Sequence, residues 1–94
     1  MRKIEKQMIE AIRSGNNWKS ANTEVRFSDI GFGNYASVYL HGHNIATVYS
    51  ADCTLPNRQT FRDWPTATTR SRLRALGVDA SIKNFQACID GEAL

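Results

Sequence analysis

The sequence predicts an α+β fold in which two helices pack on one face of a largely antiparallel sheet. Three observations support this prediction. The chain has 94 residues, which suits a single domain over residues 1–94. Apolar residues recur at helical spacing in two segments, and other segments alternate apolar and polar residues. The predicted order of elements is α-β-β-β-α-β.

The first predicted helix covers residues 1–14. Ile4, Met8 and Ile12 recur at intervals of about one helical turn, so they form an apolar stripe that can pack on a sheet. Gly15 follows the last turn and is placed to end the helix in a left-handed conformation.

A strand is predicted over residues 23–27, where alternation places Val25 and Phe27 on one face. Residues 30–34 contain two glycines and predict a turn or bulge after this strand.

Residues 37–40 and 45–49 predict a β-hairpin, because both are strand-like and a glycine lies between them. We expect Gly42 and His43 to form its two-residue turn. The cross-strand neighbours are then Leu40 with Ile45 and Val38 with Thr47.

Residues 50–65 contain several loop-forming residues and predict a loop, with a short strand near residues 58–61. The second helix is predicted over residues 66–76, and Gly77 closes it. Its buried stripe is predicted to contain Thr69, Leu73, Leu76 and Ala80.

The last long strand is predicted over residues 81–89, where alternation places Phe85 in the core. Asp90 and Gly91 are a strong signal for a type I′ turn, after which residues 92–94 return as a short strand.

The most distinctive segment, residues 64–77, combines threonines with Arg70, Arg72 and Arg74. On a helix, Arg70 and Arg74 lie one turn apart on one flank, and Arg72 projects from the other flank. The hydroxyl groups at the start of this helix belong to Thr66, Thr68 and Thr69.

Two interpretations of this segment stay open. A phosphate of a nucleotide or nucleic acid, or an acidic protein surface, can bind at the helix N-terminus and the arginines. Alternatively, the threonines cap the helix and the arginines lie across apolar neighbours. The segment lacks the glycines of a P-loop, so nucleotide hydrolysis is not expected.

Aromatic side chains supply candidate apolar anchors for a partner. If Val38 and Leu40 face inward, Tyr39 falls on the opposite face of the sheet, which stays open when the helices cover only one face. Tyr39 and Trp64 can stack on bases or anchor a protein partner, and plain surface aromatics are the alternative.

No catalytic constellation or cofactor motif is present. His41 and His43 flank a turn glycine without Asp, Glu or Cys at metal-ligand spacing, so we expect exposed turn residues rather than a metal site. Cys53 and Cys88 lack an adjacent basic activator and are expected to be reduced thiols, with Cys88 filling the core or its edge. We therefore expect no cofactor, and a binding protein rather than an enzyme.

The distribution of charged and apolar residues indicates which kinds of partner the protein can bind. The net charge is only +3, but residues 58–74 contain five arginines and a single carboxylate, Asp63. This distribution favours a local basic patch over a uniformly basic surface. No apolar run approaches the roughly 20 residues that cross a bilayer, and no apolar signal-peptide segment follows the basic start. We expect a cytoplasmic location and no membrane partner.

The α-β-β-β-α order resembles a double-stranded-RNA-binding domain. The resemblance is topological only, because that family has a lysine-rich start to its second helix and the chain has no lysine between Lys19 and Lys83.

A second resemblance covers about half the chain. Residues 38–46 (VYLHGHNIA) and residues 64–76 (WPTATTRSRLRAL) resemble small accessory proteins of bacteriophages. This resemblance implies a protein made in the cytoplasm of an infected bacterium, where it acts stoichiometrically by binding.

Taken together, these features predict a non-enzymatic binding protein that modulates or inhibits a host factor, with an antiviral defence complex as one candidate. Its contact surface is expected to combine Arg70, Arg72 and Arg74 with Trp64 or Tyr39 as an apolar anchor. A nucleic acid or nucleotide, contacted through phosphates by the same arginines, is the alternative ligand. An exposed strand or patch also allows a homodimer.

Overall fold

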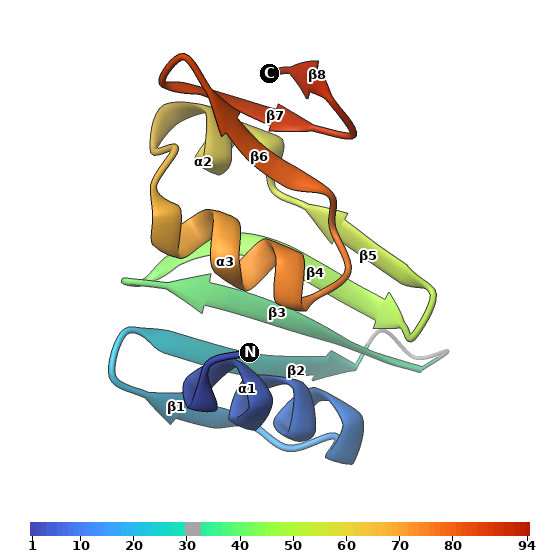
Figure 1. Cartoon of the computed structure of the whole chain (residues 1–94). Coiled ribbons are helices and arrows are strands. Elements are labelled where there is room, and N and C mark those ends of the chain that lie inside the picture. The colour runs from blue at the N-terminus through green and yellow to red at the C-terminus, as the bar shows by residue number, and fades with distance from the viewer. Residues whose placement is uncertain (30–32) are drawn as a thin grey trace.

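The computed structural model describes residues 1–29 and 33–94 and has the predicted α+β class (Figure 1). The predicted single sheet is wrong, because the strands form two separate antiparallel sheets. The helices are α1 (Lys3–Ser14), α2 (Arg58–Asp63) and α3 (Ala67–Ala75). The larger sheet contains β1 (Trp18–Ser20), β2 (Thr23–Asp29), β3 (Asn34–Leu40), β4 (His43–Ser50) and β5 (Cys53–Pro56). The smaller sheet contains β6 (Ala80–Lys83), β7 (Gln86–Ile89) and β8 (Glu92–Ala93).

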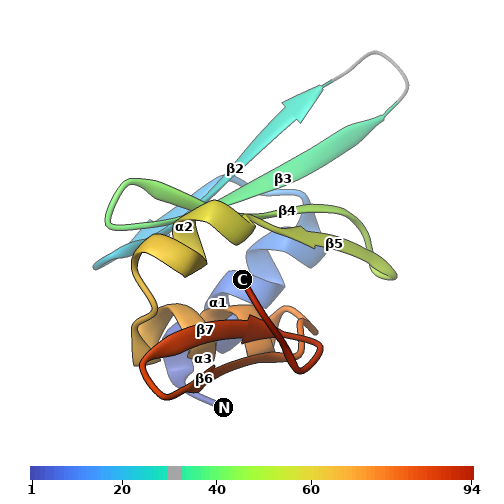
Figure 2. The same cartoon turned by 90° about the horizontal axis from the view of Figure 1, so that it is seen from above.

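The layers leave one face of the larger sheet open. Figure 2 shows α1, α3 and the smaller sheet on the same side of the β1–β5 sheet. The α2 helix packs against both β4 and β7, and α3 packs against β6, so the smaller sheet extends the layer of helices. Within the described residues, no helix or strand covers the other face of the larger sheet.

One hydrophobic core joins the two layers. The described residues of both sheets and all three labelled helices contribute buried side chains to it, and α2 supplies the fully buried Phe61. The predictions for α1 and α3 are confirmed, including the left-handed Gly15 that ends α1. On α3, Thr69 and Leu73 are buried as predicted, and Leu76 is half-buried at its end. Ala80 is buried too, but its predicted place on this helix is wrong, because it lies in β6. None of these helices has the length and apolar character of a membrane span in the described part of the chain.

The β3–β4 hairpin is present, but its predicted turn is displaced by one residue. The turn residues are His41 and Gly42, with φ of 52° and 80°, as the two positive φ values of a type I′ turn require. Leu40 consequently pairs with His43 rather than with Ile45. Histidine is among the non-glycine residues that adopt positive φ most readily, which permits this turn.

A β-bulge on β4 explains the rest of the register. Tyr39 pairs with Asn44, whereas Val38 pairs with Ala46, so Ile45 is an extra residue and the predicted Val38 pairing is also wrong. Ile45 and Ala46 are therefore both buried, although simple alternation would bury only one of them. The Asn44 side chain holds the bulge, because its amide nitrogen donates to the carbonyls of Val38 and Ala46 at 3.2 and 3.1 Å.

The predicted strand near residues 58–61 is wrong, because these residues belong to α2. Asn57 caps this helix by accepting a hydrogen bond from the Thr60 backbone N–H at 3.1 Å. The Asn57 amide also donates to the Asn44 side chain at 3.2 Å, which ties the start of α2 to the bulge.

The predicted strand over residues 81–89 is a hairpin. Asn84 and Phe85 form the turn between β6 and β7, with φ of 52° and 65°. Phe85 is 96% exposed, so its predicted burial is wrong: the turn interrupts the alternation that would have placed it in the core. The predicted turn at Asp90 and Gly91 is confirmed, with φ of 54° and 82°, and β8 follows it.

On β2, Val25 is buried and Phe27 is half-buried. The predicted turn at residues 30–34 falls largely on residues 30–32, which lie outside the described residues.

Candidate binding interface

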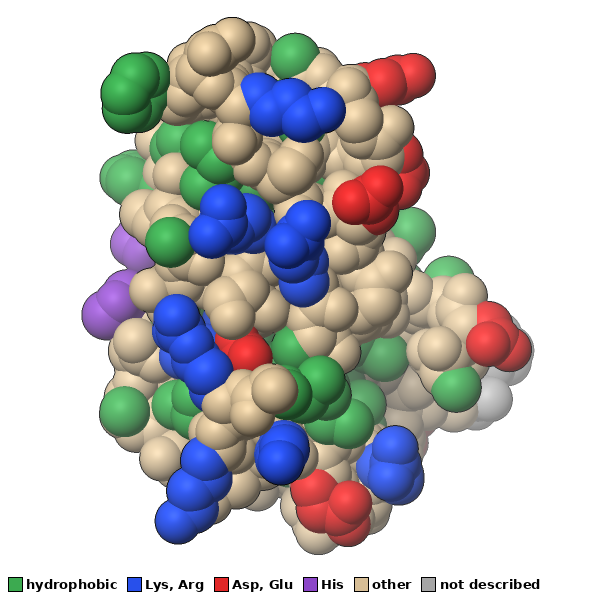
Figure 3. All heavy atoms as spheres, viewed as in Figure 1, with side chains coloured by type: hydrophobic (Ala, Val, Ile, Leu, Met, Phe, Trp, Pro, Cys, Tyr) green, Lys and Arg blue, Asp and Glu red, His purple; other side chains and the backbone are tan. Residues whose placement is uncertain are grey.

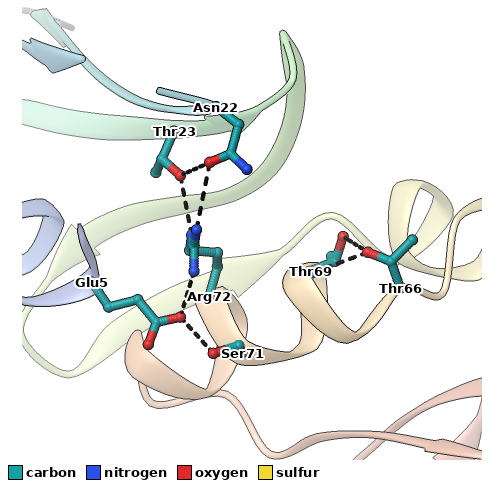
Figure 4. A network of polar contacts seen from close by, with 7 residues as sticks. All are labelled: Glu5, Asn22, Thr23, Thr66, Thr69, Ser71 and Arg72. Carbon is teal, nitrogen blue, oxygen red and sulfur yellow. Dashed lines mark hydrogen bonds and ion pairs between the residues drawn. The ribbon is translucent and has the colours of Figure 1, made fainter. Parts of the chain in front are cut away.

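Arg72 is buried, which corrects its predicted place on the surface. Only 4% of its side chain is exposed, and its Nη1 donates to Glu5 Oε2 at 2.8 Å (Figure 4). Its Nε donates to the Thr23 hydroxyl at 3.1 Å, and that hydroxyl donates in turn to Asn22 at 2.8 Å. Arg72 therefore connects α3 with α1 and with the start of β2 and cannot contact a partner.

Packing of α3 explains why the prediction for Arg72 was wrong. The helix contacts α1, β4 and β6, so more than one of its flanks is covered. Glu5 lies in the first turn of α1, where a carboxylate also interacts favourably with the helix dipole. The Ser71 hydroxyl donates to the same Glu5 oxygen at 2.6 Å, so the charge receives two side-chain donors (Figure 4).

The environment of Glu5 keeps it ionised. Burial by itself would raise the pKa of Glu5, but the hydrogen bonds from Ser71 and Arg72 and a backbone hydrogen bond at Arg2 outweigh that effect. The pKa of Glu5 therefore lies below its ordinary value of 4.5. At neutral pH the buried pair is an ion pair with no net charge.

Arg70 and Arg74 remain at the surface, as predicted. They line a hollow of about 320 Å³ between the N-terminus of α1 and α3, together with Arg2. Arg74 is fixed by a hydrogen bond from its Nε to the Ala80 carbonyl at 2.8 Å. Lys and Arg side chains gather on this face of the molecule over the helices (Figure 3).

The hollow has a surplus of positive charge. Among the described residues that line it, Glu5 is the one carboxylate, and Ser71 and Arg72 already engage it. Within residues 1–29 and 33–94, neither Arg70 nor Arg74 forms an ion pair. The hollow thus presents guanidinium groups with unused donors, which match a carboxylate or phosphate.

The threonines at the start of α3 cap the helix. Thr66 accepts a hydrogen bond from the Thr69 backbone N–H at 3.1 Å, and the two hydroxyls lie 2.9 Å apart. Thr69 is buried, so its predicted contact with a partner is wrong. Thr68 is half-buried and is not among the residues that line the arginine hollow.

Trp64 lies in a different hollow from the arginines. Its side chain is 55% exposed, and its ring stacks on His43 with centroids 5.2 Å apart. Trp64 and both turn histidines, His41 and His43, line a hollow of about 270 Å³ beside the β3–β4 turn. Trp64 is exposed as expected, but the fold does not bring it into the hollow that Arg70 and Arg74 line.

Tyr39 lies on the open face of the larger sheet, as the alternation predicts. Its strand neighbours Val38 and Leu40 are buried on the other face, toward the helices. The Arg26 guanidinium lies 4.8 Å from the Tyr39 ring centroid and pairs with Glu24 at 2.8 Å. The sheet separates Tyr39 from the α3 arginines, so one flat partner surface cannot contact both. The fold therefore does not bring Tyr39 onto the surface that Arg70 and Arg74 form.

Sequence reasoning missed two surface residues, Arg2 and Phe85. Arg2 was not singled out because nothing local relates it to α3. Phe85 was assigned to the core, although the asparagine before it was a usable signal, since Asn is common where a turn needs positive φ.

Other reactive side chains are dispersed. Within residues 1–29 and 33–94, no group of three or more His, Cys, Asp or Glu side chains could hold a metal ion. Cys53 is exposed and Cys88 is buried, and both are free thiols.

A comparison with models of protein families finds a match. The model described as Kyanoviridae Gp96 protein matches residues 1–94, which is the whole sequence. The chain belongs to this phage protein family. No curated protein and no solved structure matches it. The resemblance to phage proteins is confirmed at the level of the family, and the match gives no support to a likeness with double-stranded-RNA-binding domains.

The buried pair of Arg72 and Glu5 leads to a prediction about stability. Arg72→Met leaves Glu5 buried without its cation, so we expect the free energy of unfolding to fall by about 3–5 kcal/mol. Arg70→Met is the matched control and should change the free energy of unfolding by less than about 0.5 kcal/mol. Urea denaturation followed by circular dichroism measures both. Equal effects of the two substitutions would contradict the role of Arg72.

The lowered pKa of Glu5 predicts acid sensitivity. A group whose pKa is lower in the folded state stabilises that state fully above its ordinary pKa. This contribution is lost as the pH falls below 4.5 toward the lowered pKa. We expect Glu5→Gln to flatten the decline in Tm between neutral pH and about pH 3. A parallel decline for wild type and Glu5→Gln in calorimetry would contradict this assignment.

The left-handed Phe85 predicts a stabilising substitution. Glycine adopts φ of 65° without a Cβ penalty, so Phe85→Gly should raise the free energy of unfolding by about 0.5–1 kcal/mol. Phe85→Ala removes the same exposed ring but keeps the Cβ, so it should leave stability nearly unchanged. Thermal unfolding of the three proteins tests this, and a loss of stability in Phe85→Gly would show that the ring supports the fold.

Proposed function

We propose that this protein is a non-enzymatic phage accessory protein that binds an acidic surface of a host protein and thereby modulates or inhibits it. One observation carries the proposal: Arg2, Arg70 and Arg74 line an open hollow whose single carboxylate is already paired inside the chain. Membership of a phage protein family supports action in the cytoplasm of an infected bacterium. An antiviral defence complex is one candidate host factor.

The arginines of the hollow suit an interface with a protein. Guanidinium groups form bidentate hydrogen bonds with carboxylates, and arginine is enriched among residues that dominate binding energy. Arg74 is held by the Ala80 carbonyl, and Arg70 stands one turn away on the same helix. Fewer rotamers are therefore lost when a partner binds, which favours affinity.

Phe85 supplies an apolar anchor in place of Trp64 or Tyr39. Its side chain is almost fully exposed at the tip of the β6–β7 hairpin, and β6 packs against α3. Phe85 and the arginines therefore belong to the same layer of the molecule, on one side of the larger sheet. A partner with an apolar pocket near acidic side chains would fit both features.

The proposal is tested by affinity capture from a lysate of the bacterial host. The wild type is compared with Arg70→Glu/Arg74→Glu, in which like charges would face an acidic partner. We expect the double variant to retain less than about a tenth of the captured protein, since losing contacts of 1.4 kcal/mol or more lowers affinity at least tenfold. Arg58→Glu/Arg62→Glu is the matched control, because these exposed α2 residues lie outside the hollow.

The outcome separates the two classes of partner. Capture that survives nuclease treatment and is lost only in the α3 variant supports a protein partner. If nuclease removes the captured material and a bare oligonucleotide binds with steep salt dependence, the arginines contact phosphates and nucleic acid is the ligand instead. Capture that is equal in the wild type and the α3 variant would exclude the hollow as the contact surface.

A further inference from the structure

A third hollow, of about 470 Å³, lies at the other end of the helical layer. It is bounded by the C-terminal halves of α1 and α3, by the inner face of β2–β4 and by the start of β5. Its apolar lining is continuous with the core, because the same side chains pack against core residues while remaining partly exposed. These side chains are Ile9, Ile12, Phe27, Val48, Ala75 and Leu76.

The hollow stays open because the layer of helices is shorter than the sheet. Figure 2 shows β2 and β3 extending beyond α1 and α3. The smaller sheet packs on α3 through β6 and on α2 through β7, and neither β6 nor β7 contributes a residue to the lining. Inner-face residues such as Phe27 and Val48 are consequently half-buried, and an occupant could remove more of their apolar surface from water.

The lining of this hollow contains one positively charged side chain. Arg13, in the last turn of α1, is the one charged side chain among the described residues that line this hollow. No ion pair engages it within residues 1–29 and 33–94. Asn34, Ser50 and Thr54 add polar groups to the lining, so one part of the hollow can solvate a charged head group.

We infer that this hollow binds an acyl carboxylate, a small molecule with an unbranched apolar chain and one terminal carboxylate. The apolar lining would cover the chain, and Arg13 would pair with the carboxylate through two parallel N–H donors. The volume lies within the roughly 300–1,000 Å³ of small-molecule sites. A single arginine matches a monoanion, whereas the arginine hollow between α1 and α3 offers several cations. Among the described residues that line them, the two hollows share Ala75 but no charged side chain, so each can be altered by its own charge substitutions.

The test is an NMR titration of the isotope-labelled protein with decanoate below its micelle-forming concentration. We expect saturable shifts of backbone amides at Ile12, Phe27, Val48 and Leu76. Arg13→Gln should weaken decanoate binding roughly tenfold or more, because a charge-assisted hydrogen bond is lost. Lys6→Gln is the matched control, since it neutralises an exposed cation on α1 outside the hollow. Decanol, which has the same chain without the charge, should bind roughly tenfold more weakly than decanoate.

Each result decides the assignment. Shifts confined to the hollow, together with a loss of affinity in Arg13→Gln and with decanol, support it. Absent shifts, shifts elsewhere, or equal affinities for decanoate and decanol would overturn it. Arg70→Glu/Arg74→Glu should bind decanoate as the wild type does, so failure here is distinguishable from failure of the proposed function.

Discussion

The ion pair between Arg72 and Glu5 is the constraint on which the arrangement of helices depends. It joins side chains 67 positions apart in the sequence and lies where water is excluded. A buried charge is very unfavourable unless hydrogen bonds replace its hydration, and here Ser71 and Thr23 add the further bonds (Figure 4). Such a network is satisfied only when α1, α3 and the start of β2 are in one relative position. It therefore specifies the packing of the helices as well as contributing to it.

The same pair shapes the arginine hollow above it. Because Arg72 turns inward and neutralises Glu5, the arginines of α3 divide into one buried structural residue and two surface residues, the half-buried Arg70 and the exposed Arg74. Arg70 and Arg74 then face solvent beside Arg2 without a carboxylate of the described chain to pair with them. The positive surface is thus a product of the buried network: removing the pair would alter both the stability and the charge of the hollow.

Exposed aromatic side chains, like the exposed arginines, are unevenly distributed between the two sides of the molecule. Tyr39 lies on the open face of the larger sheet, and the rings of Tyr35 and Tyr49 lie 5.6 Å apart, whereas α3 in the layer of helices carries Arg70 and Arg74. Phe85 is exposed on the layer side at the tip of a hairpin, in a backbone conformation that disfavours a bulky residue. A residue that is both exposed and strained contributes little to the fold. This observation supports the proposal that Phe85 anchors a partner.

The sequence alone determined the helices and turns that depend on local periodicity and on the conformational preferences of single residues. The spacing of apolar residues gave α1 and α3, and Gly15 and the pair Asp90-Gly91 marked a helix end and a turn correctly. Local rules were less precise at the β3–β4 turn, where Gly42 can be either its first or its second residue. Because His41 adopts positive φ, the turn is His41-Gly42, one residue earlier than predicted. The helix over residues 58–63 is too short for its periodicity to stand out from a loop, and it depends on a cap at Asn57 and on burial of Phe61.

Only the tertiary structure decided which arginines are surface residues. Helical spacing fixes the angle between Arg70, Arg72 and Arg74 around α3, but it contains no information about what covers each side. That depends on α1, whose Glu5 meets Arg72 only after the chain has folded. The arginine hollow and the apolar hollow beside Arg13 likewise form between segments that are distant in the sequence. Contacts of this kind arise from packing, and therefore no pattern within one segment could have predicted them.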